Sequence, residues 1–150
     1  YTTKFNDVPE VEEDVCIPFG RARIVAEGAD ITVVTNSMMT IKAEKAVRQL
    51  QKEGISAELI DLRTIVPLDT ETIIRSVKKT GKLLIVDEGH LSFGITGEIA
   101  SRIMPDVFYD LDAPIQRMGT ADVPLPFSPA LEFPLIPDEK KIAAKIREMV

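Results

Sequence analysis

The sequence is poor in the residues that most often carry catalysis or bind metals. It has a single cysteine, Cys16, and a single histidine, His90. One cysteine forms no internal disulfide, and no Cys/His group has metal-ligand spacing, so we expect a reducing compartment. No serine lies in a GxSxG motif, and one histidine leaves few routes to a catalytic triad.

Aromatic residues and clusters of positive charge are also scarce. Aromatics make up 5% of the chain and Trp is absent, so aliphatic side chains must supply the core, which favours α/β layers over a β-sandwich. The net charge is −6 and no run of Lys or Arg exceeds two residues, which argues against nucleic acid and anionic membrane surfaces as partners. No apolar run has membrane-spanning length. The chain begins with Tyr1 rather than Met, so we expect it to be part of a larger protein.

Short apolar segments alternate with amphipathic segments through the first two thirds of the chain. The apolar segments are typical of strands, and they are "RARIVAEG" (21–28), "ITVVTN" (31–36), "SAELIDLR" (56–63) and "KLLIVDE" (82–88). Helices are predicted after the last three, with stops at Gly54, at Gly81 and before Pro105, and with Asp69 as the cap of the second. This alternation favours a mainly parallel sheet covered by helices on both faces.

The two ends of the sequence differ from this pattern. Residues 1–18 are acidic and contain two prolines, so we interpret them as a linker that enters a domain spanning 19–150. Residues 115–118 predict one more strand. Residues 123–137 hold five of the ten prolines, so regular structure is not expected there, although their apolar side chains need a covering surface. Asp138 predicts the cap of a last helix.

Ligands of open α/β sheets bind beyond the carboxyl ends of the strands, where "DEGH" lies. Glu88 and His90 have the chemistry of an acid/base couple, but polar residues on a solvated strand exit would look the same, and we favour that interpretation. Residues 94–97 could present amides to an anion. Because GxGxxG and GxxxxGK[ST] are absent, a tight turn before a helix fits them better.

Two further pairs of charged residues have alternative interpretations. Asp61 and Arg63 could pair across a strand exit. Asp110 and Asp112 would face the same side if they lay on a strand, or would cap backbone amides if they lay in a turn. Structural roles are favoured for both pairs, so the residues alone predict an α/β domain without a convincing catalytic set.

Four stretches together resemble a known family, in its order and over nearly the whole chain from Ile17. They are "IPFGRARIVAEGADITVVTNSMM", "DLRTIVPLD", "DEGHLSFGITGEIA" and "LDAPIQRMGTADVPLPFSPALE". They resemble the transketolase-type C-terminal domain, and more narrowly the last domain of the β subunit of thiamine-diphosphate-dependent 2-oxo acid dehydrogenases of the pyruvate, branched-chain or acetoin type.

The resemblance implies a three-layer α/β/α fold with a five-stranded, mostly parallel sheet and one antiparallel edge strand. It implies a heterotetramer of two α and two β subunits in the cytoplasm, or in the mitochondrial matrix of a eukaryote. Thiamine diphosphate and magnesium would be bound by the α subunit and the preceding β domain, and none by this chain. Because the family varies at Gly89 and His90, it assigns no catalytic role to His90.

The resemblance therefore implies an assembly and docking domain that contacts the α subunit, a second β subunit and the subunit-binding domain of a lipoyl acyltransferase. The candidate interface residues are Glu88, His90, Phe93, Asp110, Asp112 and Phe127. One alternative is the corresponding domain of transketolase or deoxyxylulose-phosphate synthase. Another, from a different class, is an independent flavodoxin-like binding module, against which the missing phosphate loop counts.

Overall fold

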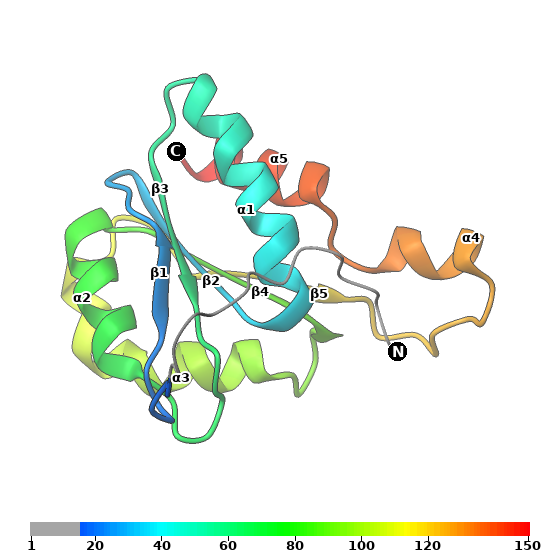
Figure 1. Cartoon of the computed structure of the whole chain (residues 1–150), viewed down its shortest axis with the longest axis horizontal. Helices are drawn as coiled ribbons and strands as arrows, with labels where there is room; N and C mark the ends of the chain where they lie inside the picture. The colour runs from blue at the N-terminus through cyan, green and yellow to red at the C-terminus, as the bar shows by residue number, and fades with distance from the viewer. Residues whose placement is uncertain (1–15) are drawn as a thin grey trace.

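A computed structural model describes residues 16–150 of the chain (Figure 1). The expected linker, residues 1–18, falls almost wholly outside the described residues. The elements are β1 (Arg23–Ala26), β2 (Ile31–Thr35), α1 (Ser37–Lys52), β3 (Ala57–Asp61), α2 (Thr70–Thr80), β4 (Leu83–His90), α3 (Ile95–Val107), η1 (Phe108–Asp110), β5 (Gln116–Thr120), α4 (Pro129–Glu132), η2 (Phe133–Leu135) and α5 (Glu139–Met149).

The strands form one five-stranded sheet in the order β1-β3-β2-β4-β5. β2, β3, β4 and β5 run parallel, and β1 pairs antiparallel with β3 at one edge. The chain leaves the central strand β2 first towards β3 and then crosses to β4 on the other side. This reversal places the topological switch point beyond the carboxyl end of β2.

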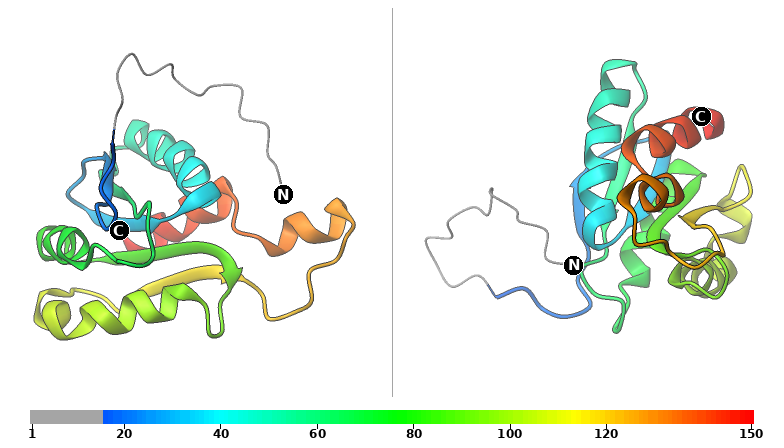
Figure 2. Two further views of the ribbon diagram at one scale, coloured as in Figure 1. Left: turned by 60° about the horizontal axis from the view of Figure 1, so that its bottom comes forward. Right: turned by 90° about the vertical axis from the view of Figure 1, so that its right-hand side faces the viewer.

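Helices cover both faces of the sheet (Figure 2), which confirms the predicted three-layer α/β/α fold. One apolar cluster joins α1 and α5 to one face, and a second joins α2 and α3 to the other. All five residues of β2 are buried. Successive residues of a strand point to opposite faces, so Val33 belongs to the first cluster and Val34 to the second.

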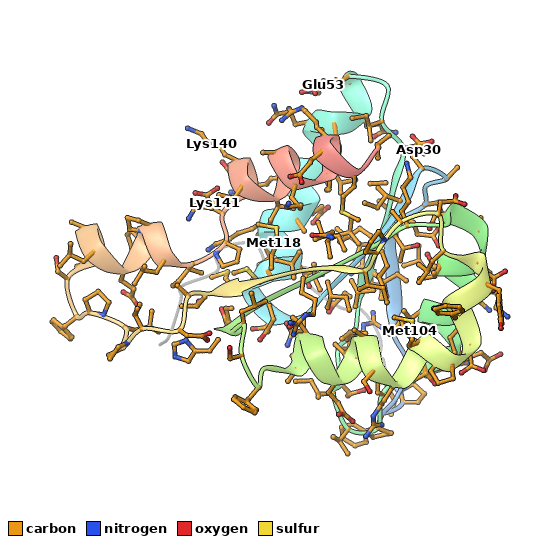
Figure 3. All side chains as sticks on the ribbon, turned by 180° about the vertical axis from the view of Figure 1, so that it is seen from behind. Asp30, Glu53, Met104, Met118, Lys140 and Lys141 are labelled. Atoms are coloured by element: carbon orange, nitrogen blue, oxygen red, sulfur yellow. The ribbon has the colours of Figure 1, made fainter. Side chains whose placement is uncertain are left out.

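Local signals in the sequence set the ends of several helices, as predicted. Asp69 caps α2 by accepting a hydrogen bond from the Thr72 amide at 3.0 Å, and Gly81 ends α2 in the left-handed region with φ of 68°. Asp138 caps α5 in the same way. Glu53, labelled in Figure 3 at the end of α1, accepts two hydrogen bonds from Arg147 of α5 at 2.7 and 2.8 Å, which joins the two helices of one layer.

The expectation that the third helix stops before Pro105 is wrong, because α3 continues through that proline to Val107. Pro105 has no backbone N–H, so one hydrogen bond of the last turn is missing. Val107, however, is fully buried in the same cluster as Ile103, and this packing continues the apolar face past the proline. None of the helices in residues 16–150 combines the length and apolarity that a bilayer span requires.

The segment expected to lack regular structure, 123–137, contains two short helical pieces, α4 and η2. Pro129 occupies the first turn of α4, where a proline sacrifices no hydrogen bond because the amides there have no helical partner. The backbone oxygen of Ser128 accepts from the Leu131 and Glu132 amides at 2.9 Å. Proline position, rather than proline content, decides the local structure.

Candidate functional site

The switch point at the carboxyl ends of β2, β3 and β4 is occupied by carboxylates that bind their own backbone. Asp61 accepts from the Arg63 amide at 3.1 Å, so this contact is a turn and not a side-chain ion pair. Asp87, 8% exposed, accepts from the Gly89 amide at 2.9 Å. Among residues 16–150, no group of three or more His, Cys, Asp or Glu side chains could hold a metal ion.

The turn after β4 is fastened to β5 and to the residues that follow it. The His90 ring nitrogen Nδ1 lies 2.9 Å from the Ala121 oxygen, and Thr120 Oγ1 donates to the Glu88 backbone oxygen at 2.7 Å. Ser92 donates to Asp122 from its hydroxyl at 2.5 Å and from its amide at 3.2 Å. These two hydrogen bonds from Ser92 lower the pKa of Asp122. The His90 ring therefore contacts the backbone after β5, and no hydrogen bond joins it to the Glu88 side chain.

Phe93 and Gly94 complete this turn and expose an aromatic ring. Phe93 has φ of 57° and its side chain is fully exposed. Gly94 is required by close approach, because a Cβ there would lie 2.1 Å from the His90 oxygen. The turn therefore projects Phe93 into solvent while the helix begins directly behind it, an arrangement suited to contact with another molecule.

The proline-rich arm, residues 121–137, extends from the carboxyl end of β5 and projects away from the sheet (Figures 1 and 2). Its exposed apolar side chains are Val123, Leu125, Phe127, Leu131 and Phe133. Phe127 is 99% exposed. Lys141, labelled in Figure 3 at the start of α5, donates to the backbone oxygens of Pro134 and Ile136 and so holds the base of the arm. Because Asp122 binds Ser92, the arm begins beside the turn that carries Phe93.

Asp110 and Asp112 lie at the amino ends of the parallel strands, next to the start of β4. We call this end of the sheet the amino edge, and the opposite end the carboxyl edge. Asp110 pairs with Lys78 of α2 at 3.8 Å, and the Asp112 amide donates to the Gly81 oxygen at 2.8 Å. Lys82 donates to the Val150 backbone oxygen at 3.5 Å at the same edge. The six residues predicted as interface positions are thus divided between two surfaces.

Exposed aromatic rings accompany the two aspartates. Phe108 and Tyr109 pack edge to face with their ring centroids 5.1 Å apart, and they are 61% and 96% exposed. A shallow apolar groove beside them is lined by Met104, Leu111 and Ile115 among others. Sequence reasoning missed this pair, because "VFYD" continues an apolar helix face and only the fold shows which side is solvent.

Each of these two surfaces combines exposed aromatic side chains with polar or charged groups. The carboxyl-edge surface consists of Glu88, His90, Phe93 and the arm. The amino-edge surface consists of Phe108, Tyr109, Asp110 and Asp112. Exposed aromatic residues rimmed by polar groups are typical of protein contact sites. Among residues 16–150, the acidic side chains do not gather into a group that could hold a metal ion.

Two β subunits of 2-oxo acid dehydrogenases are similar to nearly the whole chain. The chain is 47% identical over 143 residues to the pyruvate dehydrogenase E1 component subunit beta of Rickettsia felis, covering 95% of the chain and 43% of that protein. It is 41% identical over 138 residues to the 2-oxoisovalerate dehydrogenase subunit beta of Bacillus subtilis, covering 91% of the chain and 42% of that protein. The chain therefore spans less than half the length of these relatives.

A solved structure is also similar. The inactive beta4 tetramer of a split-gene transketolase matches with a TM-score of 0.76 and 28% identity, over 95% of the chain and 45% of that protein. The sequence model for the transketolase C-terminal domain matches residues 20–142, which is most of the chain and includes the whole sheet. This chain belongs to the transketolase C-terminal domain family.

Proposed function

We propose that the chain is the C-terminal assembly and docking part of the β subunit of a thiamine-diphosphate-dependent 2-oxo acid dehydrogenase. The observation that carries the proposal is identity above 40% to dehydrogenase β subunits over nearly the whole chain. The intact enzyme would decarboxylate a 2-oxo acid oxidatively and transfer the acyl group to a lipoyl group. Relatives named for pyruvate, 2-oxoisovalerate and acetoin are 47%, 41% and 42% identical to the chain, so the substrate is left open among these three.

The cofactor and its magnesium would be held by other parts of the enzyme. In support, Asp61 and Asp87 at the switch point accept hydrogen bonds from neighbouring amides, and no metal-ligand group gathers among residues 16–150. The chain would support the reaction by holding the subunits in register. The rival proposal is that the chain is the corresponding domain of transketolase or deoxyxylulose-phosphate synthase. The sequence upstream of Tyr1 would distinguish the two proposals.

The carboxyl-edge surface would take part in assembly with the α subunit and a second β subunit. The arm carries five exposed apolar side chains and the adjacent turn carries Phe93. Prolines restrict the arm before association, so less conformational entropy is lost when it is covered. Support also comes from the tetrameric state of the split-gene transketolase relative.

The amino-edge surface would receive the subunit-binding domain of the acyltransferase. Aromatic rings are common anchors of protein interfaces, and Phe108 and Tyr109 are exposed beside Asp110 and Asp112. Acidic groups at the rim would steer a basic partner and act mainly on the association rate. Asp110 already forms an ion pair with Lys78, which offsets its charge, so Asp112 would contribute more to steering than Asp110.

The test is made with the longer protein that contains this sequence, expressed together with its α subunit. We expect decarboxylation of pyruvate or a branched-chain 2-oxo acid that depends on thiamine diphosphate and magnesium. The 150-residue chain alone should show no heat of binding with the same cofactor. Micromolar affinity of the chain alone, or an intact enzyme inactive on 2-oxo acids and acetoin but active on sugar phosphates, would contradict the proposal.

Docking is tested separately by measuring association of the intact enzyme with the subunit-binding domain at rising salt. The Asp112→Asn variant should associate more slowly at low salt and similarly at high salt. Glu71→Gln, which removes one charge from the exposed first turn of α2, away from this surface, serves as the control. Association insensitive to salt and to Asp112→Asn would show that this surface does not steer the partner.

A further inference from the structure

A third surface feature, at the carboxyl end of β3 and apart from the arm and the turn that carries Phe93, gathers positive charge. Arg21, Arg63 and Arg75 line one hollow between the chain entering β1, the loop after β3 and the exposed side of α2. None of the three pairs with a carboxylate among the described residues. By contrast, Arg48 and Arg147 each bind a glutamate. Three guanidinium groups around one hollow repel one another unless an anion joins them.

The carboxylate of Asp69 also lines the hollow, where the nearby charge of Arg21 helps to lower its pKa, but its hydrogen bonds come from other groups. It accepts hydrogen bonds from the Ala22 amide at 2.9 Å and from the Thr72 amide and hydroxyl at 3.0 and 2.8 Å. Its two oxygens therefore serve the helix cap and the entering chain. The hollow keeps a net charge of about +2, that is, three guanidinium groups and one carboxylate.

The backbone that presents Arg63 is held in a conformation that a side chain seldom adopts. Arg63 has φ of 56°, where Gly or Asn would be placed with less strain. The loop is fixed by hydrogen bonds from the Arg63 amide to Asp61 and from Thr64 Oγ1 to the Pro67 oxygen. The Gly20 amide donates to Thr64 Oγ1 at 2.9 Å, which positions Arg21 beside this loop. An arginine at a strained, well-held position indicates a use for its side chain.

We propose that this hollow binds a phosphate monoester, with Arg21, Arg63 and Arg75 contacting the phosphate and the wall formed by Ile17 and Ile24 contacting its carbon part. A phosphate monoester carries about −1.5 to −2 charges at pH 7, which matches the charge of the hollow. The planar guanidinium donates two parallel hydrogen bonds to such an oxyanion. Ile17 and Ile24 are 49% and 38% exposed, so they offer apolar surface beside the charges.

The test is a calorimetric titration of the chain with phenyl phosphate at constant ionic strength, with inorganic phosphate and benzoate in parallel. We expect saturable binding in the order phenyl phosphate, inorganic phosphate, benzoate. Arg63→Gln should weaken phenyl phosphate binding by about tenfold or more, since it removes charge-assisted hydrogen bonds to the phosphate. Arg75→Gln lies on an exposed helix face and should weaken binding while preserving the fold. Arg48→Gln, the control for charge alone, should leave the dissociation constant within about twofold.

A short phosphoserine peptide distinguishes the two sources of the group. Tighter binding of the peptide would identify a phosphorylated side chain as the ligand, and tighter binding of phenyl phosphate would identify a small molecule; either supports the site. The acidic residues Glu12, Glu13 and Asp14 precede the hollow in the sequence. If phosphate binds only after these three are changed to their amides, the hollow serves the chain's own acidic segment and the proposal is wrong. A titration with phenyl phosphate that does not saturate also overturns the proposal. So does a loss of affinity in Arg48→Gln equal to that in Arg63→Gln.

Discussion

Replacing Asp69 with alanine should destabilise the domain more than removal of a helix cap alone. Loss of the cap of α2 costs about 1 kcal/mol in typical cases. The Ala22 amide, which donates to the same carboxylate across 47 positions of sequence, would be left without its partner at a part-buried site. An unsatisfied donor costs a further 1–3 kcal/mol or so, which gives a total of about 2–4 kcal/mol.

Asp138→Ala is the matched control, because Asp138 caps α5 by accepting one side-chain hydrogen bond from the Lys141 amide at 2.8 Å. We expect a loss of about 1 kcal/mol there. In urea denaturation at pH 7, with a slope of roughly 2 kcal/mol/M, the midpoint should fall by about 1–2 M for Asp69→Ala and about 0.5 M for Asp138→Ala. Equal shifts of the midpoint for the two variants would refute a stabilising hydrogen bond between the Ala22 amide and Asp69 of α2.

The same carboxylate predicts a pH dependence. Burial alone would raise the pKa of Asp69, but the hydrogen bonds from Ala22 and Thr72, with the nearby charge of Arg21, outweigh it, and the pKa lies below its ordinary value. A carboxylate with a depressed folded-state pKa stabilises fully above the unfolded value, about 3.9, and less as pH falls below it. The stability gap between the wild type and Asp69→Ala should therefore narrow from pH 7 to pH 3. A gap that stays constant or widens would contradict this assignment.

Two further predictions compare neighbouring positions. Gly94→Ala should lower the free energy of unfolding by about 1–3 kcal/mol, because the added Cβ would lie 2.1 Å from a backbone oxygen. Gly97→Ala should change the free energy of unfolding by less than about 1 kcal/mol in thermal unfolding, because its Cβ would contact only the tip of a guanidinium at 3.0 Å. Ile103→Ala should lose about 2–5 kcal/mol because the side chain is fully buried, and Phe93→Ala should change monomer stability by less than about 0.5 kcal/mol. A large loss for Phe93→Ala would show that the ring packs within the domain.

The sequence predicted those parts of the fold that local signals control. The β-branched run of β2, the cap at Asp69 and the stop at Gly81 are each readable from neighbouring residues. The path of α3 through Pro105 was not, because it depends on burial of Val107 against distant strands. The first-turn position of Pro129 after Ser128 was a readable signal for α4 that proline content obscured.

The sequence predicted where single candidate residues lie, but not which of them share a surface. A histidine and a glutamate at the exit of β4 could be placed at the carboxyl edge from strand order alone. Asp110 and Asp112 belong to the other edge, which only the pairing of the Asp112 amide with Gly81 reveals. The arginines of the hollow come from three separate segments, so no local pattern could have joined them.

The most direct test of the assembly role is sedimentation of the chain from about 1 to 100 μM, compared with Phe127→Glu and Phe108→Glu. The account predicts that the wild type rises from the monomer of 16.6 kDa towards a dimer. Phe127→Glu should abolish this rise because it places a charge on the arm, and Phe108→Glu, at the opposite edge, should leave it unchanged. A wild type that stays monomeric throughout, or variants that associate equally, would contradict assembly through the arm.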